Sequence, residues 1–285
     1  MKAQLIDGKQ ISAEIKAEAA AEAAQLKEQG IVPCLAVVLV GDDSASKVYV
    51  SNKQKACEAV GIASVSHLLS GGTTEEELLR LIAELNEDPK IHGILVQLPL
   101  PKQIDETKVI LAIDPKKDVD CFHPVNVGYL YTGGKGFLPC TPAGIIALIQ
   151  RSGHTIEGKQ CVVIGRSNIV GKPVAMLLMQ ENGTVTICHS KTRNLAEICR
   201  GADIIVSATG KVNTVTADMV KEGAVIIDVG MNRNAEGKLC GDVDFENVKE
   251  VAGAITPVPG GVGPMTIAML MKNCITAAKL QNGLM

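Results

Sequence analysis

Short, continuous apolar runs alternate with longer amphipathic stretches along most of this 285-residue chain. The clearest run covers residues 34–40, lies between Pro33 and Gly41, and contains no charged residue. An unbroken apolar run of this length is typical of a strand that is buried on both faces, as the strands of a parallel sheet are. The helical stretches between such runs supply the crossover connections that parallel strands need. The pattern therefore predicts an α/β protein whose parallel sheets are covered by helices.

Helix caps and chain breakers set the expected bounds of the individual elements. Helices are expected over residues 8–30, 44–60, 74–89, 104–112, 142–152, 170–180, 195–200 and 265–280. Strands are expected over residues 34–40, 62–69, 91–98, 160–164, 184–188, 204–207 and 224–229. Thr73 or Thr74, followed three residues later by Glu76 or Glu77, predicts a capping box, and Gly61 is expected to end a helix. The last helix is long enough to cross back and pack on the first domain.

An irregular stretch separates two runs of alternation. Residues 114–140 hold three prolines and four glycines, and a long irregular segment in a compact protein is usually functional or a linker. At about 150 residues per domain, the chain length corresponds to roughly two domains. We therefore predict two three-layer α/β domains: residues 1–140 with 266–285, and residues 141–265. Three lysines of the irregular stretch are expected to be solvated: Lys116, Lys117 and Lys135.

The composition argues against several classes of function. Aromatic residues make up 2% of the chain and the formal net charge is −3, which argues against nucleic-acid binding by stacking or by a global positive field. No run approaches the ~18 apolar residues of a membrane span, and the first residues lack the apolar core of a secretory signal. The nine cysteines form no C-x-x-C pair. This pattern predicts reduced thiols in a cytoplasmic-type compartment, with a compartment reached by a cleaved transit peptide as the alternative, and no metal site.

A glycine-containing turn between a strand and a helix opens the second run of alternation. It reads C-V-V-I-G-R-S-N-I-V-G-K-P over residues 161–173, with Gly165 leaving the strand and Gly171 at the start of the helix. Such a turn presents backbone N–H groups to a phosphate, although it differs from the generic G-x-G-x-x-G pattern. The turn alone favours a cofactor site and a plain turn about equally.

The strand after this turn bears on which cofactor would fit. In an NAD site its end carries an Asp or Glu for the ribose 2′-hydroxyl. Here residues 189–192 read H-S-K-T and contain no acid, while Arg166 lies in the glycine turn itself. Cationic and hydroxyl groups suit a 2′-phosphate, so NADP is favoured over NAD. The alternative interpretation is an exposed, solvated loop.

In the first half of the chain, Tyr49 and Lys53 lie four residues apart on one predicted helix and so share a face. Such a pair is most often an ordinary surface pair. However, Q-L-P-L-P at residues 97–101 ends a buried strand, where α/β proteins place ligands, and Asp120 lies in the irregular stretch. A partly desolvated Lys53 beside an amide is suited to general acid–base catalysis, because burial lowers the pKa of a lysine.

Five motifs occur together in the order and spacing of one known family. They are Y-V-S-N-K, V-Q-L-P-L-P, K-D-V-D, G-R-S-N-I-V-G-K-P and T-P-V-P-G-G-V-G-P-M-T, and the likeness covers residues 6–280. The chain resembles the bifunctional methylenetetrahydrofolate dehydrogenases/methenyltetrahydrofolate cyclohydrolases. The resemblance implies that NADP accepts a hydride from 5,10-methylenetetrahydrofolate, and that water then opens the 5,10-methenyl cation to 10-formyltetrahydrofolate. It also implies an active-site cleft between the two domains and a Rossmann-type second domain. Further implications are a role in one-carbon metabolism and purine biosynthesis, a homodimer built on the cofactor domains, and folate substrates with or without a polyglutamate tail.

The same resemblance implies roles for individual residues. Lys53 is the catalytic amine, Gln97 hydrogen-bonds it and tunes its protonation, and Tyr49 borders the folate. Asp120 binds the amino and ring N–H edge of the pterin, an acceptor matched to two donors. Further folate contacts are implied for Leu98, Pro99, Pro259, Gly260, Gly261, Val262 and Gly263. The implied NADP-binding residues are Gly165, Arg166 and Ser167 on the phosphates, Ser190 near the 2′-phosphate, and Met231 against a ribose.

Two positions depart from the family's pattern. Cys121 follows Asp120 where Gly is usual. We expect the small side chain to be tolerated, and the alternative is that it alters the turn that aims Asp120. Met231 stands where Ile is common, which conserves volume.

Three alternative functions stay open at this point. They are a dehydrogenase-only member of the same family, a shikimate-type NADP dehydrogenase, and a non-catalytic folate-binding protein. The second would not need Q-L-P-L-P or P-G-G-V-G-P, yet both are present. The intact set of Tyr49, Lys53, Gln97 and Asp120 weighs against the third.

Overall fold

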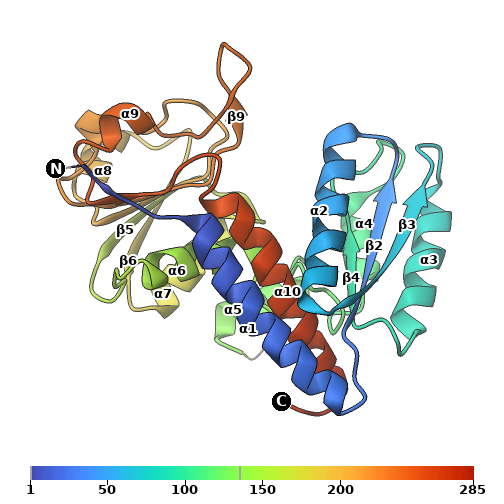
Figure 1. The fold of residues 1–285 in the computed structure, drawn as a ribbon. Coiled ribbons are helices and arrows are strands. Elements are labelled where there is room, and N and C mark those ends of the chain that lie inside the picture. Colours follow the sequence, from blue (N-terminus) through green and yellow to red (C-terminus); the bar gives the residue numbers. More distant parts are fainter. Residues whose placement is uncertain (1, 135) are drawn as a thin grey trace. The chain divides into compact units, whose positions relative to one another are not determined.

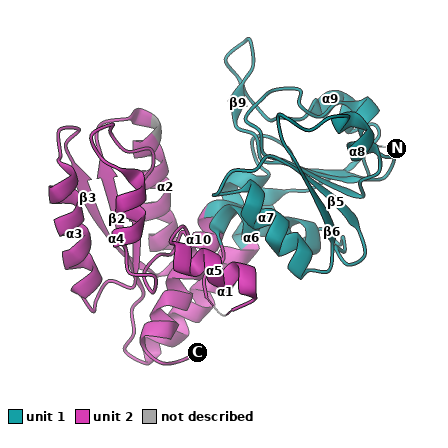
Figure 2. Cartoon of the chain, turned by 180° about the vertical axis from the view of Figure 1, so that it is seen from behind, with its two compact units in different colours: residues 1–13, 139–266 teal, residues 14–138, 267–285 magenta. Residues whose placement is uncertain are grey.

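The chain forms two compact α/β units, each with its own parallel sheet, in the computed structural model (Figures 1 and 2). The six-stranded unit comprises residues 1–13 and 139–266, and the three-stranded unit comprises residues 14–138 and 267–285. The α/β class with parallel sheets, predicted from the alternation of elements, is confirmed.

The structure describes residues 2–134 and 136–285, so the prediction that Lys135 is solvated falls outside the described residues. Across these residues, no helix combines the length and apolar character that a membrane crossing needs.

The start of the chain lies with a different unit from the one that the predicted boundaries gave it. Strand β1 (Gln4–Leu5) pairs in parallel with β11 (Ala254–Ile255), at one edge of the six-stranded sheet. The backbone N–H of Ile6 also donates to the carbonyl of Ile255 at 2.9 Å. These ladder bonds join residues 1–13 to the six-stranded unit, although residues 1–140 were expected to form one domain. Strands of two residues carry too little periodicity to be predicted.

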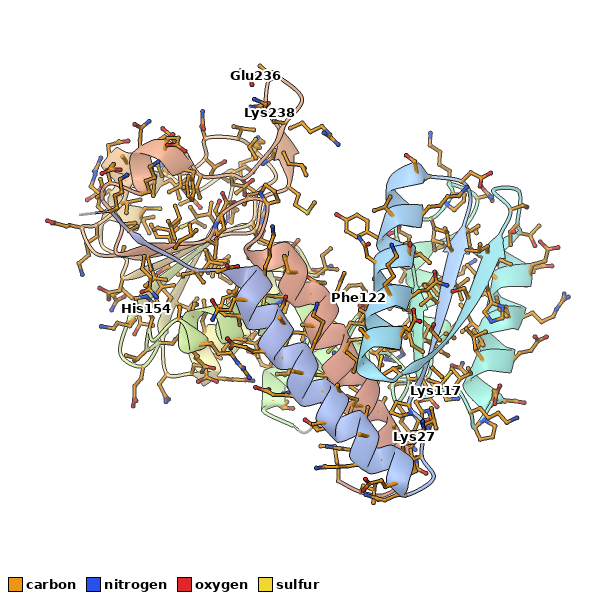
Figure 3. The ribbon with its side chains drawn as sticks, in the orientation of Figure 1. Lys27, Lys117, Phe122, His154, Glu236 and Lys238 are labelled. Atoms are coloured by element: carbon orange, nitrogen blue, oxygen red, sulfur yellow. The ribbon has the colours of Figure 1, made fainter. Side chains whose placement is uncertain are left out.

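The six-stranded sheet has the order β1-β11-β8-β7-β5-β6, and every neighbouring pair is parallel. Its other strands are β5 (Gln160–Ile164), β6 (Thr184–Cys188), β7 (Ile204–Ser207) and β8 (Val225–Asp228). One face is covered by α6 (Cys140–Arg151) and α7 (Gly171–Gln180), and the other by α8 (Leu195–Arg200), η1 (Ala217–Met219) and α9 (Phe245–Val248) (Figure 1). A separate hairpin pairs β9 (Asn232–Arg233) with β10 (Leu239–Cys240), and Figure 3 labels Glu236 and Lys238 near its tip.

The three-stranded sheet has the order β3-β2-β4, again parallel. Its strands are β2 (Cys34–Val40), β3 (Ala63–Leu69) and β4 (Gly93–Val96). One face packs against α3 (Glu75–Glu87) and α4 (Glu106–Ala112), and α2 (Ser44–Val60) lies over the other (Figure 1). All seven residues of the central strand are buried, as its unbroken apolar run predicts. The predicted capping box is formed by Thr74 and Glu77 at the start of α3.

Two long helices, α1 (Gly8–Glu28) and α10 (Val262–Gln281), run side by side (Figures 1 and 2). Within the three-stranded unit Lys279 pairs with Glu22 across them at 2.5 Å. Gln281 Nε2 donates to the carbonyl of His92 at 2.7 Å and so ties the end of α10 to the residue just before β4. These contacts place the second half of α10 in the three-stranded unit.

A helix that the sequence analysis missed, α5 (Pro124–Thr132), lies within the stretch expected to be irregular. Its proline and glycine were interpreted as breakers, but here they mark the ends of a helix. Pro124 is the first helical residue, where the missing N–H has no cost, and His123 Nδ1 accepts from the N–H of Val125 at 3.1 Å. Gly133 ends the helix with φ 71°.

The prediction that Lys117 is solvated is wrong. Its side chain is buried, with 5% of the residue exposed (labelled in Figure 3). Its Nζ donates to the carbonyls of Leu85 at 2.9 Å and Asp88 at 2.7 Å. Lys117 therefore satisfies carbonyl groups at the end of α3 that have no partner within the helix.

Candidate functional site

The side chains of Lys53 and Gln97 meet in the three-stranded unit. Helix α2 begins after Asp43, whose carboxylate accepts from the N–H of Ser46 at 2.7 Å, and it places Tyr49 and Lys53 one turn apart on the same face. Lys53 Nζ donates to Gln97 Oε1 at 2.9 Å. The pairing joins the middle of a helix to the end of a strand, 44 residues further along the chain.

The backbone around Gln97 explains how this contact is held. The N–H of Gln97 donates to the carbonyl of Val38 at 2.8 Å, so the residue continues β4 alongside β2 at the carboxyl end of the sheet. Gln97 Nε2 donates to the carbonyl of Leu98 at 2.6 Å. Because the amide nitrogen is engaged there, the amide oxygen faces Lys53. The Leu98–Pro99 peptide bond that follows is cis.

Asp120 lies in a tight turn organised by its neighbour Asp118, which the sequence analysis did not weigh. Asp118 is 3% exposed, and its carboxylate accepts from the N–H groups of His123 at 2.8 Å and Phe122 at 3.2 Å. Asn126 Nδ2 of α5 donates to the same carboxylate at 2.8 Å. The two acids of K-D-V-D therefore have different roles. The carboxylate of Asp118 accepts hydrogen bonds within the turn, and the half-buried Asp120 lines a small pocket together with Asp118, Leu98 and Phe122. Phe122 is labelled in Figure 3.

Cys121 and Asn273 hold the other side of this turn. Cys121 has φ 62°, the left-handed conformation that glycine adopts most easily, and its thiol donates to the carbonyl of Phe137 at 3.2 Å. Asn273 of α10 donates from Nδ2 to the carbonyls of Val119 at 2.7 Å and Leu138 at 2.8 Å. The cysteine therefore occupies the backbone conformation that the family's usual glycine would take, and Asn273 is a further supporting residue without a sequence signal.

The glycine turn after β5 packs so closely that two positions admit no side chain. A Cβ at Gly165, where φ is 128°, would lie 2.3 Å from the carbonyl oxygen of Ala208, and one at Gly171 would lie 2.3 Å from that of Gly165. Ser167 Oγ accepts from the N–H groups of Val170 and Gly171, each at 3.2 Å. Both hydroxyl lone pairs are then occupied, so the hydroxyl can only donate outward, as a phosphate oxygen requires.

The turn after β6 exposes cationic and hydroxyl groups without an acid. His189 holds this turn in shape: its backbone N–H donates to Thr192 Oγ1 at 2.8 Å, and its Nδ1 accepts from the N–H of Lys191 at 3.1 Å. Ser190 and Lys191 are exposed, as is Arg166 in the glycine turn. Arg193, which the sequence analysis did not weigh, adds another exposed cation just beyond this turn. The donor set fits a 2′-phosphate and lacks the carboxylate that a 2′-hydroxyl site uses.

The P-V-P-G-G segment packs against the first residue of α1 within the six-stranded unit. A Cβ at Gly8 would lie 1.8 Å from the carbonyl oxygen of Gly261, so α1 starts with a glycine because the two backbones touch. Gly260 has φ 112°, and the Val258–Pro259 bond is cis. Val262 and Gly263 form the first turn of α10, which begins three residues before the predicted Met265.

The predicted site residues thus fall into two groups. The three-stranded unit holds Tyr49, Lys53, Gln97, Leu98, Pro99 and Asp120. The six-stranded unit holds Gly165, Arg166, Ser167, Ser190, Met231, Pro259, Gly260, Gly261, Val262 and Gly263. Of the first group, the structure joins Lys53 to Gln97 directly. Of the second, Met231 is 57% exposed and directly precedes β9.

Two protein-family models match most of the chain. Residues 6–120 match the model described as "Tetrahydrofolate dehydrogenase/cyclohydrolase, catalytic domain". Residues 139–282 match "Tetrahydrofolate dehydrogenase/cyclohydrolase, NAD(P)-binding domain".

Whole proteins and solved structures of similar sequence agree with these models. The bifunctional protein FolD of Agathobacter rectalis is 62% identical over 277 residues, which cover 97% of this chain and 99% of that protein. The structure of the FolD methylenetetrahydrofolate dehydrogenase/cyclohydrolase from Campylobacter jejuni superimposes with a TM-score of 0.95 at 52% identity, covering 97% of this chain and 99% of that one. The Trypanosoma brucei FolD, solved with NADP cofactor and inhibitor, has a TM-score of 0.93 at 41% identity and covers 98% of both chains.

Proposed function

Because this chain belongs to the tetrahydrofolate dehydrogenase/cyclohydrolase family, it is a bifunctional one-carbon enzyme, and we propose that the residues around Lys53 carry both of its reactions. The first is the NADP-dependent oxidation of 5,10-methylenetetrahydrofolate to 5,10-methenyltetrahydrofolate. The second is the hydrolysis of that product to 10-formyltetrahydrofolate. The observation that carries the proposal is the hydrogen bond between Lys53 Nζ and Gln97 Oε1, because it fixes an amine at the carboxyl end of a buried strand.

Lys53 is assigned the proton transfers of the hydrolytic step. Water adds to the bridge carbon and gives up one proton, and the bond from that carbon to one folate nitrogen breaks as the nitrogen gains a proton. The remaining hydroxyl proton leaves to solvent as the formyl C=O bond forms, so the step releases one proton overall. An amine that is held in place can take the first proton and return the second. Gln97 keeps this amine in position, since its own Nε2 is occupied by the carbonyl of Leu98.

Binding of the folate is assigned to the neighbouring residues. Asp120 offers two carboxylate oxygens to the amino and ring N–H edge of the pterin, while Asp118 fixes the turn beneath it. Tyr49 shares a helix face with Lys53 and borders the ring system. The remaining contacts come from backbone-rich segments with little side-chain bulk: Leu98, Pro99, Pro259, Gly260, Gly261, Val262 and Gly263.

The residues after β5 and β6 fit NADP. Gly165, Arg166 and Ser167 are assigned to its phosphates, with Arg166 and Ser190 at the 2′-phosphate, and the backbone of Met231 to a ribose. The fit rests on the glycine packing, on the outward-donating Ser167 hydroxyl and on the absence of an acid at residues 189–193. When bound, NADP supplies the acceptor for the hydride of the one-carbon bridge.

The wider setting follows from the family resemblance and from the cysteines. We assign folate binding to the predicted domain of residues 1–140 with 266–285, whose residues 1–13 belong structurally to the six-stranded unit, and cofactor binding to residues 141–265. The enzyme is proposed to act in the cytoplasm, since its nine cysteines are free thiols. It is further proposed to form a homodimer through the cofactor domains, to accept polyglutamylated folates and to supply one-carbon units for purine biosynthesis.

A paired assay on the purified protein tests this function. 5,10-Methylenetetrahydrofolate is supplied with NADP or, separately, with NAD, and the reduced cofactor, the methenyl intermediate and the 10-formyl product are followed. We expect all three species to form, with NADP preferred. Reduction that stops at the methenyl compound would leave a dehydrogenase alone, and no reduction with either cofactor would refute the proposal.

A further inference from the structure

Two acidic side chains are buried in the six-stranded unit, close to where β7 and β8 end. Asp242 is fully buried and Asp228 is 3% exposed. Burying a carboxylate is costly unless hydrogen bonds replace its water. The donors that replace it here are backbone N–H groups and neutral side chains. Neither acid belongs to a motif that the sequence analysis singled out.

Asp242 joins the turn after β7 to the start of β9. Its carboxylate accepts six hydrogen bonds, four of them from residues 209–211 directly after the strand. Oδ2 accepts from Thr209 N (2.6 Å), Thr209 Oγ1 (2.9 Å), Ser207 Oγ (3.1 Å) and Gly210 N (3.3 Å), and Oδ1 accepts from Asn232 Nδ2 (2.9 Å) and Lys211 N (3.0 Å). One carboxylate therefore sets the shape of two segments that are far apart in the sequence.

Asp228 in turn fixes Asp242. Its Oδ1 accepts from the N–H groups of Gly230 and Asp242, each at 2.9 Å, and its Oδ2 accepts from Val243 N at 3.0 Å. The chain passes so close to the two acids that a Cβ at Gly230 would lie 2.2 Å from Asp242 Oδ1, and one at Gly241 would lie 1.8 Å from Asp228 Oδ2. The glycines on either side of the hairpin are thus explained by the buried carboxylates.

The position of these segments in the sheet gives them a role. Strand β5 has β6 on one side and β7 on the other, so the strand order reverses there, and a dinucleotide lies across such a point with one mononucleotide on each side. The turns after β5 and β6 suit the 2′-phosphorylated adenosine half. The turns after β7 and β8, which Asp242 and Asp228 shape, follow strands on the opposite side of β5, where the other half would lie. We propose that Asp242 is a positioning residue for the nicotinamide half of NADP, acting through the backbone of residues 209–211 and through Asn232.

This inference rests on the proposed use of NADP, and a binding experiment separates the two. Dissociation constants are measured by calorimetry for NADP and for adenosine 2′,5′-bisphosphate, which carries only the adenosine half. In Asp242→Asn one acceptor oxygen becomes a donor that faces other donors. We expect NADP to bind about tenfold more weakly or worse, with the bisphosphate changed by less than about twofold. If the wild-type protein binds neither compound, the proposed function itself is wrong.

Asp203→Asn is the matched control. Asp203 lies beside the opposite end of β7, where its carboxylate accepts from the N–H of Gln160 at 2.9 Å and pairs with Lys221 at 2.6 Å. Its substitution is expected to leave the ratio of the two dissociation constants unchanged. Equal weakening of both compounds by Asp242→Asn, or no weakening of NADP, would overturn the assignment.

A second pair of variants decides the matter if Asp242→Asn does not fold. Thr209→Val removes the hydroxyl that donates to Asp242 Oδ2 but keeps the side-chain shape, whereas Thr209→Ser keeps the hydroxyl. We expect the valine variant to lose NADP affinity selectively and the serine variant to retain it. A purely structural role would lower thermal stability in Thr209→Val and would leave the ratio of the dissociation constants as in the wild type, which contradicts the proposal.

Discussion

The candidate site of the three-stranded unit consists mainly of side-chain groups, whereas that of the six-stranded unit consists mainly of backbone groups. In the three-stranded unit the chemistry lies in side chains, with the amine of Lys53 held by Gln97 and the carboxylate of Asp120 presented by a turn. In the six-stranded unit the candidate site is formed mostly by backbone. Glycines bring chain segments into contact there, and Ser167 Oγ accepts hydrogen bonds from backbone N–H groups of its own turn. The first site supplies proton transfer, and the second supplies a surface for a cofactor that brings its own reactivity.

The difference shows how each site should respond to mutation. A side-chain site loses its chemistry when one functional group is removed, while its shape survives. A backbone site has few groups whose removal ends a reaction, and it depends instead on buried residues such as Asp242 that set its shape. The following predictions compare the two kinds of site, beginning with the largest expected effect.

Replacing Lys53 with Met should give the largest loss. The variant lacks the amine assigned to the proton transfers, so the cyclohydrolase rate should fall by about 10²–10⁴, while folate and NADP binding stay measurable. Rates of 10-formyltetrahydrofolate formation from the methenyl compound provide the measurement. Lys55→Met, which removes an exposed amine from the same helix, serves as the control and should act like the wild type. Hydrolysis at the wild-type rate in Lys53→Met would remove Lys53 from the mechanism.

Replacing Arg166 with Ala should have a smaller, selective effect. A charge-assisted hydrogen bond contributes about 1.5–3 kcal/mol, so NADP should bind roughly 10- to 100-fold more weakly, whereas NAD, which has no 2′-phosphate, should change little. The measurement is the ratio of kcat/KM with the two cofactors. Arg200→Ala, which removes an exposed guanidinium close to Asp218, should leave the ratio unaltered. Equal losses for both cofactors would mean that Arg166 does not contact the 2′-phosphate.

Much of the fold could be predicted because its signals are local. The unbroken apolar run of Cys34–Val40, the capping box of Thr74 and Glu77 and the helix-ending Gly61 each depend on neighbouring residues. Helix α5 was missed because Pro124 stops one helix or starts another depending on what precedes it. A proline therefore has a clear meaning only once the cap before it is known.

The residues of the candidate sites likewise differ in whether local sequence signals reveal them. Motifs in the sequence point to Lys53 and Gln97, because their chemistry belongs to the residues themselves. Asp242 and Asn273 could not be found that way, since what they hold comes from distant parts of the chain: Asn273 donates to Val119, 154 residues earlier. Lys117 was wrongly predicted to be solvated because lysine is rarely buried. Its partners, the carbonyls of Leu85 and Asp88 at the C-terminal end of α3, are identified only by the folded structure.

Replacing Lys117 with Met tests whether the three-stranded unit depends on such a buried polar group. The change keeps most of the side-chain volume but leaves the carbonyls of Leu85 and Asp88 without the Nζ donor. We expect the free energy of unfolding to fall by about 1–3 kcal/mol, measured by urea titration. Lys116→Met, at an exposed neighbouring position, should change it by less than about 0.5 kcal/mol. Equal stability of the two variants would show that these hydrogen bonds contribute nothing net.

The smallest effect is expected for Cys121→Gly. Glycine would relieve about 1–2 kcal/mol of strain at φ 62°, but it adds about 0.4–1 kcal/mol of unfolded-state entropy and loses roughly 1 kcal/mol from the buried side chain. These contributions nearly cancel, so the free energy of unfolding should change by less than about 1 kcal/mol.

The Cys121→Gly variant also tests which feature of the turn orients the side chain of Asp120. Because the backbone conformation is unchanged, the KM for the folate should stay within about twofold of the wild type, whereas the β-branched Cys121→Val should destabilise the protein, since its side chain resists positive φ. Asn182→Gly, at an exposed position with φ 63°, controls for the backbone change alone. A large rise in KM for Cys121→Gly would mean that the thiol and its bond to Phe137, rather than the left-handed backbone, hold the turn. The three-stranded site would then depend on a side chain even where its sequence pattern allows a glycine.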